Sequence, residues 1–187
     1  MPKRLLTLLT PWLFVLCAPA LAADHSADVV LVVHGSAISD TSRQQTLETV
    51  IETTAEGLGG NSRLGLFEFD ADTHQQSPLE SVSKGLGEKL LTSLLIASER
   101  KNGQLNPATA LEKAIYQLRT EGRKHASRIV IMLSDGAMAS GDKTQDGSLR
   151  QWMRDGLSSE AEAAGIRIYW LTLSEAAGQV ESRHPRS

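Results

Sequence analysis

The sequence predicts an α/β fold with three layers, in which a mainly parallel sheet lies between two layers of helices. Val29–Val33 and Ile129–Leu133 are continuous apolar runs rich in Val and Ile, which is typical of parallel strands buried on both faces. Strand-like and helix-like segments alternate along the chain, so we expect helical crossovers between the strands. The chain has no internal repeat and no linker-like stretch, and we therefore predict one domain.

The first half of this domain is expected to hold two strands, two helices and a break that precedes a short edge strand. A helix over about 41–58 follows the Val29–Val33 strand and ends in a run of glycines. Arg63–Phe69 is predicted to be the second strand, and Ser77-Pro78-Leu79 a break before a short edge strand. Leucines at helical spacing predict a helix over Lys89–Ala97.

The second half begins with a strong helix-start signal. Asn106 is a favoured N-cap residue, and Pro107 suits the first helical position. We expect Gly165 to stop a later helix. The remaining elements expected here are the strand Ile129–Leu133, a polar loop over Ala137–Gly147, a helix over Ser148–Ala164 and a last strand over Ile166–Leu173.

The first 22 residues have the pattern of a secretory signal peptide. Lys3 and Arg4 form a basic start, Leu5–Cys17 is an apolar stretch that is short for a membrane span, and Ala20–Ala22 is a small-x-small cleavage signal. We therefore predict a signal peptide over 1–22 and an exported protein that is periplasmic or secreted. An uncleaved membrane anchor is the alternative, and it is the only membrane contact that we expect.

Cleavage would leave residues 23–187 as a single domain with a polar tail from about 175. It would remove the one cysteine, and with it any disulfide or thiol chemistry. It would also take the net charge from -3 to -5, because two basic residues leave with the signal and no acidic residue does. Nothing in the sequence resembles a basic stripe, so we expect no nucleic-acid partner.

Five segments, in order and covering Asp28 to about Ser174, resemble the von Willebrand factor A (VWA) domain family. They are DVVLVVHGSAIS, SRLGLFEFD, NPATALEKAI, RIVIMLSDGAMASGD and AAGIRIYWLTLS. The resemblance implies a Rossmann-like three-layer fold and a role as a binding module. Family members often hold a divalent cation, usually magnesium, in a metal-ion-dependent adhesion site built from an Asp-x-Ser-x-Ser loop, a threonine and a further aspartate.

Carried over residue by residue, this chain keeps part of that adhesion site. Ser36 matches the first serine and Asp135 matches the aspartate of the third loop, so these two are the candidate metal ligands. His34 stands at the position of the first aspartate, Ile38 at the second serine and Leu105 at the threonine. Because magnesium prefers oxygen ligands, we expect weak or absent magnesium binding and no other cofactor.

Function is predicted to lie at the carboxyl ends of the strands, where open α/β sheets bind their ligands. We expect a non-catalytic protein-binding or adhesion module whose partner is another protein, which the sequence does not identify. Ser39 lies one residue beyond the second serine position, where a bulged loop would bring its hydroxyl inward. The candidate ligand-binding residues are His34, Ser36, Ser39, Asn106 and Asp135.

His34 leaves two alternatives open. An imidazole favours zinc, copper or nickel over magnesium, and Asp70, Asp72 and Asp135 are the acids that could join it in an altered metal site. The other reading is that His34 fills the space of the lost carboxylate and hydrogen-bonds to Asp135 or to loop carbonyls. His34-Gly35-Ser36 after a strand also resembles the strand ends of α/β-hydrolases and sirohydrochlorin chelatases. The chain lacks the Gly-x-Ser-x-Gly elbow of the hydrolases, so a small metal-dependent enzyme using His34 is only the alternative function.

Two other groups of residues are compatible with catalysis or sugar binding, but each also has a purely structural interpretation. Glu68, Asp70 and Asp72 could pair for acid–base catalysis, but acids at a strand end are more often a solvated rim. An aromatic sugar-stacking surface is also conceivable, although two of its members lie in a predicted core strand and favour packing. Its residues would be Trp152, Tyr169 and Trp170.

Family members usually continue with a further strand and helix after the strand that corresponds to Ile166–Leu173. Residues 175–187 lack apolar periodicity, so we expect both elements to be missing. The Ile166–Leu173 strand would then be an open edge. A second protein that completes this edge by strand addition is one hypothesis, and a truncated, marginally stable gene product is the other.

Overall fold

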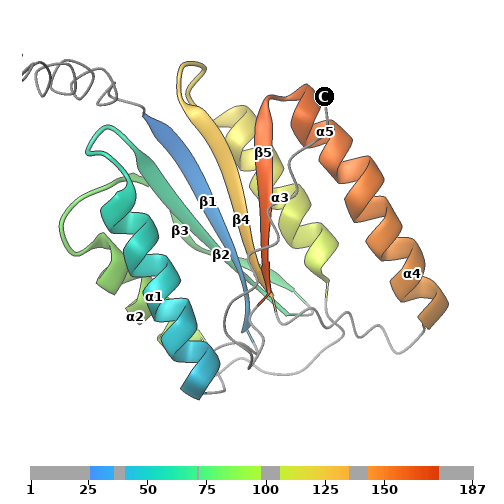
Figure 1. Cartoon of the computed structure of the whole chain (residues 1–187), viewed down its shortest axis with the longest axis horizontal. Helices are drawn as coiled ribbons and strands as arrows, with labels where there is room; N and C mark the ends of the chain where they lie inside the picture. The colour runs from blue at the N-terminus through green and yellow to red at the C-terminus, as the bar shows by residue number, and fades with distance from the viewer. Residues whose placement is uncertain (1–25, 36–40, 71, 98–105, 135–142, 173–187) are drawn as a thin grey trace, which may run out of the picture.

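A computed structural model describes residues 26–35, 41–70, 72–97, 106–134 and 143–172. Helices lie on both faces of a five-stranded sheet (Figure 1). The strands are β1 (Ala27–His34), β2 (Arg63–Phe69), β3 (Thr73–Ser81), β4 (Ser127–Ser134) and β5 (Ile166–Thr172). The helices are α1 (Thr41–Gly57), α2 (Leu86–Ala97), α3 (Pro107–Thr120), α4 (Lys143–Trp152) and α5 (Ser158–Ala163), with a π-helical segment at Met153–Leu157 between the last two.

The sheet has the order β3-β2-β1-β4-β5. Strand β1 pairs in parallel with β2 and β4, and β4 pairs in parallel with β5, whereas β3 is antiparallel to β2. The predicted mainly parallel three-layer fold is therefore confirmed. The parallel strands β1, β4 and β5 all point the same way in Figure 1, so their carboxyl ends share one edge of the sheet.

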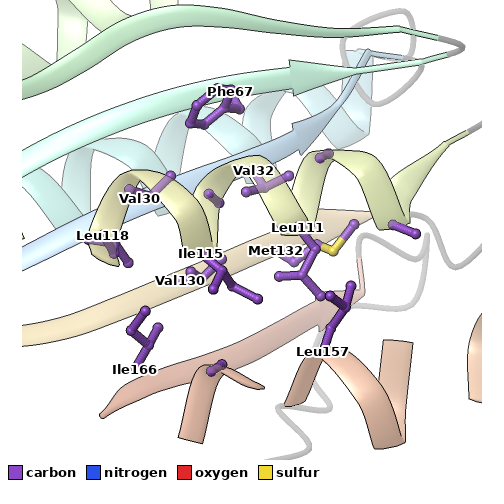
Figure 2. Packing of buried hydrophobic residues seen from close by; sticks show 14 of the residues in the cluster. Val30, Val32, Phe67, Leu111, Ile115, Leu118, Val130, Met132, Leu157 and Ile166 are labelled. Carbon is purple, nitrogen blue, oxygen red and sulfur yellow. The ribbon is translucent and has the colours of Figure 1, made fainter. Parts of the chain in front are cut away.

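Strand β1 is buried along its whole length because helices cover both of its faces. Val29, Leu31 and Val33 pack with apolar residues of α1 and α2. Val30 and Val32 point to the other face and join the apolar side of α3 and the segment that ends in α5 (Figure 2). The strict alternation along a strand explains why one continuous apolar run supplies both cores.

A buried carboxylate ties three segments together at the amino edge of the sheet. Asp28 of β1 is fully buried and accepts hydrogen bonds from Arg63 Nε and Nη2 at 3.0 and 2.7 Å. It also accepts them from Arg123, through the backbone N at 2.6 Å and Nη2 at 2.7 Å. Burial by itself raises the pKa of Asp28, but the hydrogen bonds from the two arginines outweigh it and lower the pKa to about 2.

The predicted break at Ser77-Pro78-Leu79 is wrong, because β3 runs through it. The register with β2 shifts between Leu64 and Leu66, so the chain bulges at this point. The backbone of Pro78 and Leu79 lies 3.4 Å from where a Cβ on Gly65 would stand. Since β3 pairs with β2 alone among the described strands, the edge position and the bulge accommodate the proline.

The predicted helix over Ser148–Ala164 begins earlier and is interrupted. Helix α4 starts at Lys143, inside the predicted loop over Ala137–Gly147, and the π-helical segment separates α4 from α5. Gly156 stands in this segment, and a Cβ there would come within 2.9 Å of the Trp152 ring. Helix α2 likewise begins at Leu86 rather than Lys89. Gly165 ends the last helix with a φ of 66°, as predicted.

Strand β5 forms where the sequence predicts a last strand, but its aromatic residues are not core residues. Tyr169 and Trp170 are each 39% exposed, so the packing interpretation of these two side chains is wrong. The reason is positional, because within the described residues β5 pairs only with β4 and has no strand on its other side. No helix of the described segments is long and apolar enough to cross a membrane.

Candidate functional site

The candidate site lies at the carboxyl edge of the sheet, where β1 and β2 end side by side. In the parallel register, His34 at the end of β1 is the partner of Phe69 at the end of β2. Strand β4, on the other side of β1, ends at Ser134. Three strands thus deliver their final residues to one small region, as the position of the apolar runs predicts.

His34 is a buried residue of β1 rather than a residue of the loop after it. Its side chain is only 2% exposed, and its ring stacks on that of Phe69 at a centroid distance of 5.1 Å and an interplanar angle of 19°. Its Nε2 lies 3.6 Å from Asp70 Oδ1. The imidazole therefore occupies a space bounded by an aromatic face and a carboxylate. The predicted partner Asp135 lies outside the described residues.

Asp70 is held over the end of β1 by the absence of a side chain at Gly35. A Cβ placed on Gly35 would stand 2.4 Å from Asp70 Oδ2 and 2.9 Å from the carboxyl carbon. The glycine therefore provides the room that the carboxylate occupies. Asp70 is 26% exposed, so it presents part of its charge to solvent.

Asn106 joins the start of α3 to this edge and caps the helix as predicted. Its Oδ1 accepts a hydrogen bond from the backbone N of Thr109 at 3.1 Å. Its own backbone N donates to the Asp70 carbonyl oxygen at 2.8 Å. Asn106 thus fixes the position of α3 relative to β2, and its side-chain oxygen is used by the helix. Its predicted role in ligand binding stays a prediction.

The other predicted site residues cannot be placed. Ser36, Ser39 and Asp135, the candidate ligand and metal residues, lie outside the described segments, as do Ile38 and Leu105. Among the residues that are described, no group of three or more potential metal ligands comes together. At the position of the first aspartate, the buried nitrogen donor His34 does not fit magnesium, which prefers oxygen ligands in octahedral geometry.

The acidic rim predicted around Glu68 is only partly correct. Glu68 is 3% exposed and accepts a hydrogen bond from Gln76 Nε2 at 2.7 Å, so it is a buried, paired residue rather than a solvated one. Asp72 is exposed, as expected for a rim. Sequence reasoning missed the stacking role of Phe69 and the contact of Gln76. The alternation of Phe67 and Phe69 was the available signal for the first, and nothing indicated the second.

The strands and helices described above define a class of domain. A mainly parallel sheet flanked by helices is a Rossmann-like domain, a class in which ligands commonly bind beyond the carboxyl ends of the strands. The profile of the von Willebrand factor type A domain matches residues 28–181. The chain belongs to this family.

Solved structures show the same fold at low sequence identity. BatB from Bacteroides thetaiotaomicron has a TM-score of 0.59 at 17% identity, covering 86% of this chain and 77% of BatB. Manganese-loaded TRAP from Plasmodium vivax has a TM-score of 0.60 at 17% identity, covering 81% of this chain and 59% of TRAP. An aerotolerance-related membrane protein from Bacteroides fragilis has a TM-score of 0.59 at 14% identity, and the match covers 86% of this chain and 78% of that protein. No curated protein sequence matches the chain significantly.

Proposed function

We propose that this chain is an exported, non-catalytic protein-binding module whose contact surface is the carboxyl edge of the sheet and whose binding does not require a divalent cation. The observation that carries the proposal is the burial of His34 at the position of the family's first metal-binding aspartate. Stacked on Phe69 and 3.6 Å from Asp70, the imidazole takes the place of a carboxylate that would hold the cation.

The fold and the family support binding rather than chemistry. VWA domains generally act as interaction modules, and the described part of the carboxyl edge brings together no catalytic constellation. The enzyme alternative rests on His34, and at 2% exposure its ring is poorly placed to reach a substrate. A binding module with a retained or altered metal site is one alternative, and a small metal-dependent enzyme using His34 is the other.

Export rests on two further observations. The first 22 residues have the basic start, apolar stretch and small-residue cleavage signal of a secretory signal peptide. One structural neighbour is described as a membrane protein. A protein partner outside the cytoplasm fits both observations.

Site-specific photo-crosslinking tests where the partner binds. A photo-reactive amino acid would replace exposed Asp72 at the carboxyl edge or, as the matched control, exposed Lys124 near the amino edge. We expect irradiation of cells that express the full chain to give a discrete adduct from position 72 only. Adducts of equal yield from both positions, or none from position 72, would contradict the proposed surface.

A thermal-melt titration with magnesium, manganese, calcium and zinc, each against a chelator control, tests the metal component. A cation that binds the folded state must raise the melting midpoint by mass action, and we expect no shift. A magnesium or manganese shift that Asp135→Ala abolishes would show that the adhesion site survives. A zinc shift that His34→Ala abolishes would favour the enzyme alternative.

A further inference from the structure

A groove lies between α3 and the edge strand β3, and its lining includes Thr73, which follows Asp72 and pairs with Phe69 of β2. Its volume is about 470 Å³. Phe67, on the α3 side of β2, forms part of its wall and lies apart from the main group of core side chains in Figure 2. The groove is lined by Phe67, Thr73, Gln75, Glu112, Lys113, Tyr116, Gln117 and Glu121.

Two buried polar atoms in the wall of this groove have no hydrogen-bond partner among the described residues. They are Thr73 Oγ1, on a side chain that is 9% exposed, and Gln117 Oε1, on a side chain that is 4% exposed. The Gln117 amide is oriented by its other end, because Nε2 donates to Glu121 Oε2 at 3.2 Å. Its oxygen is therefore left as an acceptor that needs an N–H or O–H donor.

The charges around the groove favour a cationic donor. Glu112 and Glu121 are exposed carboxylates at its rim. The one cation among its lining residues, Lys113, donates its Nζ to the Thr73 carbonyl oxygen at 3.0 Å and thereby joins α3 to β3. The lining residues therefore carry two carboxylates and one ammonium group, and this negative charge is the opposite of what an anion site needs.

An aromatic face completes the arrangement. Tyr116 is 66% exposed although it lies on a helix whose other side is core. A guanidinium stacks well on such a ring, and its five N–H donors lie in one plane. An arginine side chain can therefore reach an amide oxygen and a carboxylate together while its plane covers the tyrosine. An ammonium group, with a compact charge, has no such planar match.

From these observations we propose that the groove between α3 and β3 is a second binding site, which takes an arginine side chain of an extended protein segment. The guanidinium lies on Tyr116 and donates to the Glu121 carboxylate and to Gln117 Oε1, which is buried in the free protein and becomes accessible on binding. Thr73 of the groove follows Asp72 of the carboxyl edge, so arginine titration of variants at Gln117 and Glu121, and not crosslinking from position 72, decides this proposal separately from the first.

Nuclear magnetic resonance titration of the purified full chain tests this site with N-acetyl-arginine amide as the probe. N-acetyl-citrulline amide, which has nearly the same shape but no charge, is the matched control ligand. We expect arginine amide to shift the Gln117 side-chain amide signals and the backbone signals of Thr73 and Tyr116, and citrulline amide to bind at least tenfold more weakly. Equal shifts with both ligands, or shifts confined to other surfaces, would overturn the proposal.

Substitutions locate the contacts. Glu121→Gln and Gln117→Leu should each weaken arginine amide binding by about tenfold, because each removes an acceptor for a charged donor. Glu162→Gln is the control, since it removes an exposed carboxylate from α5 outside the groove. If Glu162→Gln weakens binding as much as Glu121→Gln does, the attraction is only the general charge of the protein and the proposal fails.

A peptide distinguishes a protein segment from free arginine as the source of the guanidinium. Acetyl-Gly-Ser-Arg-Ser-Gly-amide should bind several-fold more tightly than N-acetyl-arginine amide, because its backbone extends along the groove. Equal affinity for the two would overturn the assignment to a protein segment.

Discussion

The two edges of the sheet hold a carboxylate in opposite environments, Asp28 at the amino edge and Asp70 at the carboxyl edge. At the amino edge, Asp28 is fully buried and two arginines satisfy its carboxylate at 2.6–3.0 Å. At the carboxyl edge, Asp70 is partly exposed and lies 3.6 Å from His34. The first arrangement joins three chain segments at the amino edge of the sheet, whereas the second leaves a carboxylate partly exposed to solvent. The comparison separates a carboxylate whose bonds maintain the fold from one at the surface where we propose that a partner binds.

The largest expected effect is at the amino edge. Asp28→Asn would leave Arg63 and Arg123 facing a neutral side chain in a buried position, and we expect it to lower the free energy of unfolding by about 2–4 kcal/mol. Urea denaturation followed by circular dichroism measures this. The matched control is Asp155→Asn, an exposed carboxylate, which should change stability by less than about 0.5 kcal/mol. Equal losses in the two variants would contradict the structural role of Asp28.

The lowered pKa of Asp28 predicts that acid reduces the stability of the fold. The pKa of Asp28 is about 2 in the folded chain against an ordinary value of 3.8, so the charged form stabilises the fold above the unfolded pKa. This contribution, about 2 kcal/mol, is lost as the pH falls from about 5 to about 2. Urea unfolding at intervals across this range should show the loss in the native chain. A slope of equal steepness in Asp28→Asn would assign the acid sensitivity to other groups.

At the carboxyl edge, a substitution at Gly35 tests whether Asp70 is held in its observed position. In Gly35→Ala the new methyl group would overlap the Asp70 carboxyl group, which must swing away from His34. We expect a stability loss of about 1–2 kcal/mol and a change in the photo-crosslinking yield from position 72. A variant that matches the native chain in both stability and crosslinking would show that Asp70 is not held in this place.

The smallest effect is expected at the start of α3. Asn106→Ala removes the acceptor for the Thr109 backbone N–H and should cost about 1 kcal/mol of stability. Asn106→Asp keeps an acceptor at the N-cap position and serves as the control. If Asn106→Asp destabilises the chain as much as Asn106→Ala does, the capping hydrogen bond is not the reason for the loss.

Local patterns predicted most of the fold because they act over a few residues. The apolar runs of β1 and β4, the cap at Asn106 and the glycine stop at Gly165 are all readable from adjacent positions. The sequence predicts a break in β3 because Pro78 disfavours strand structure locally. The strand continues because it lies at the edge of the sheet and bulges opposite Gly65, where a proline is tolerated. The π-helical turn leaves the surrounding apolar spacing nearly helical, so periodicity did not reveal it.

The site was less predictable than the fold. The sequence placed His34 at the end of a strand but did not show that its ring stacks on Phe69, because that contact depends on the register of β1 against β2. The groove between α3 and β3 was not anticipated at all. Its lining residues come from three separate elements, and none of them forms a motif.

The sequence by itself determined the fold class, the family and the loss of the first metal-binding carboxylate, because apolar periodicity and residue identity are properties of short segments. Tertiary structure alone decided which charges meet. Asp28, Arg63 and Arg123 are far apart along the chain, as are Thr73 and Gln117. Packing fixes their distances and burial, and these two quantities set the hydrogen-bonding and electrostatic energies that separate a structural ion pair from a binding site.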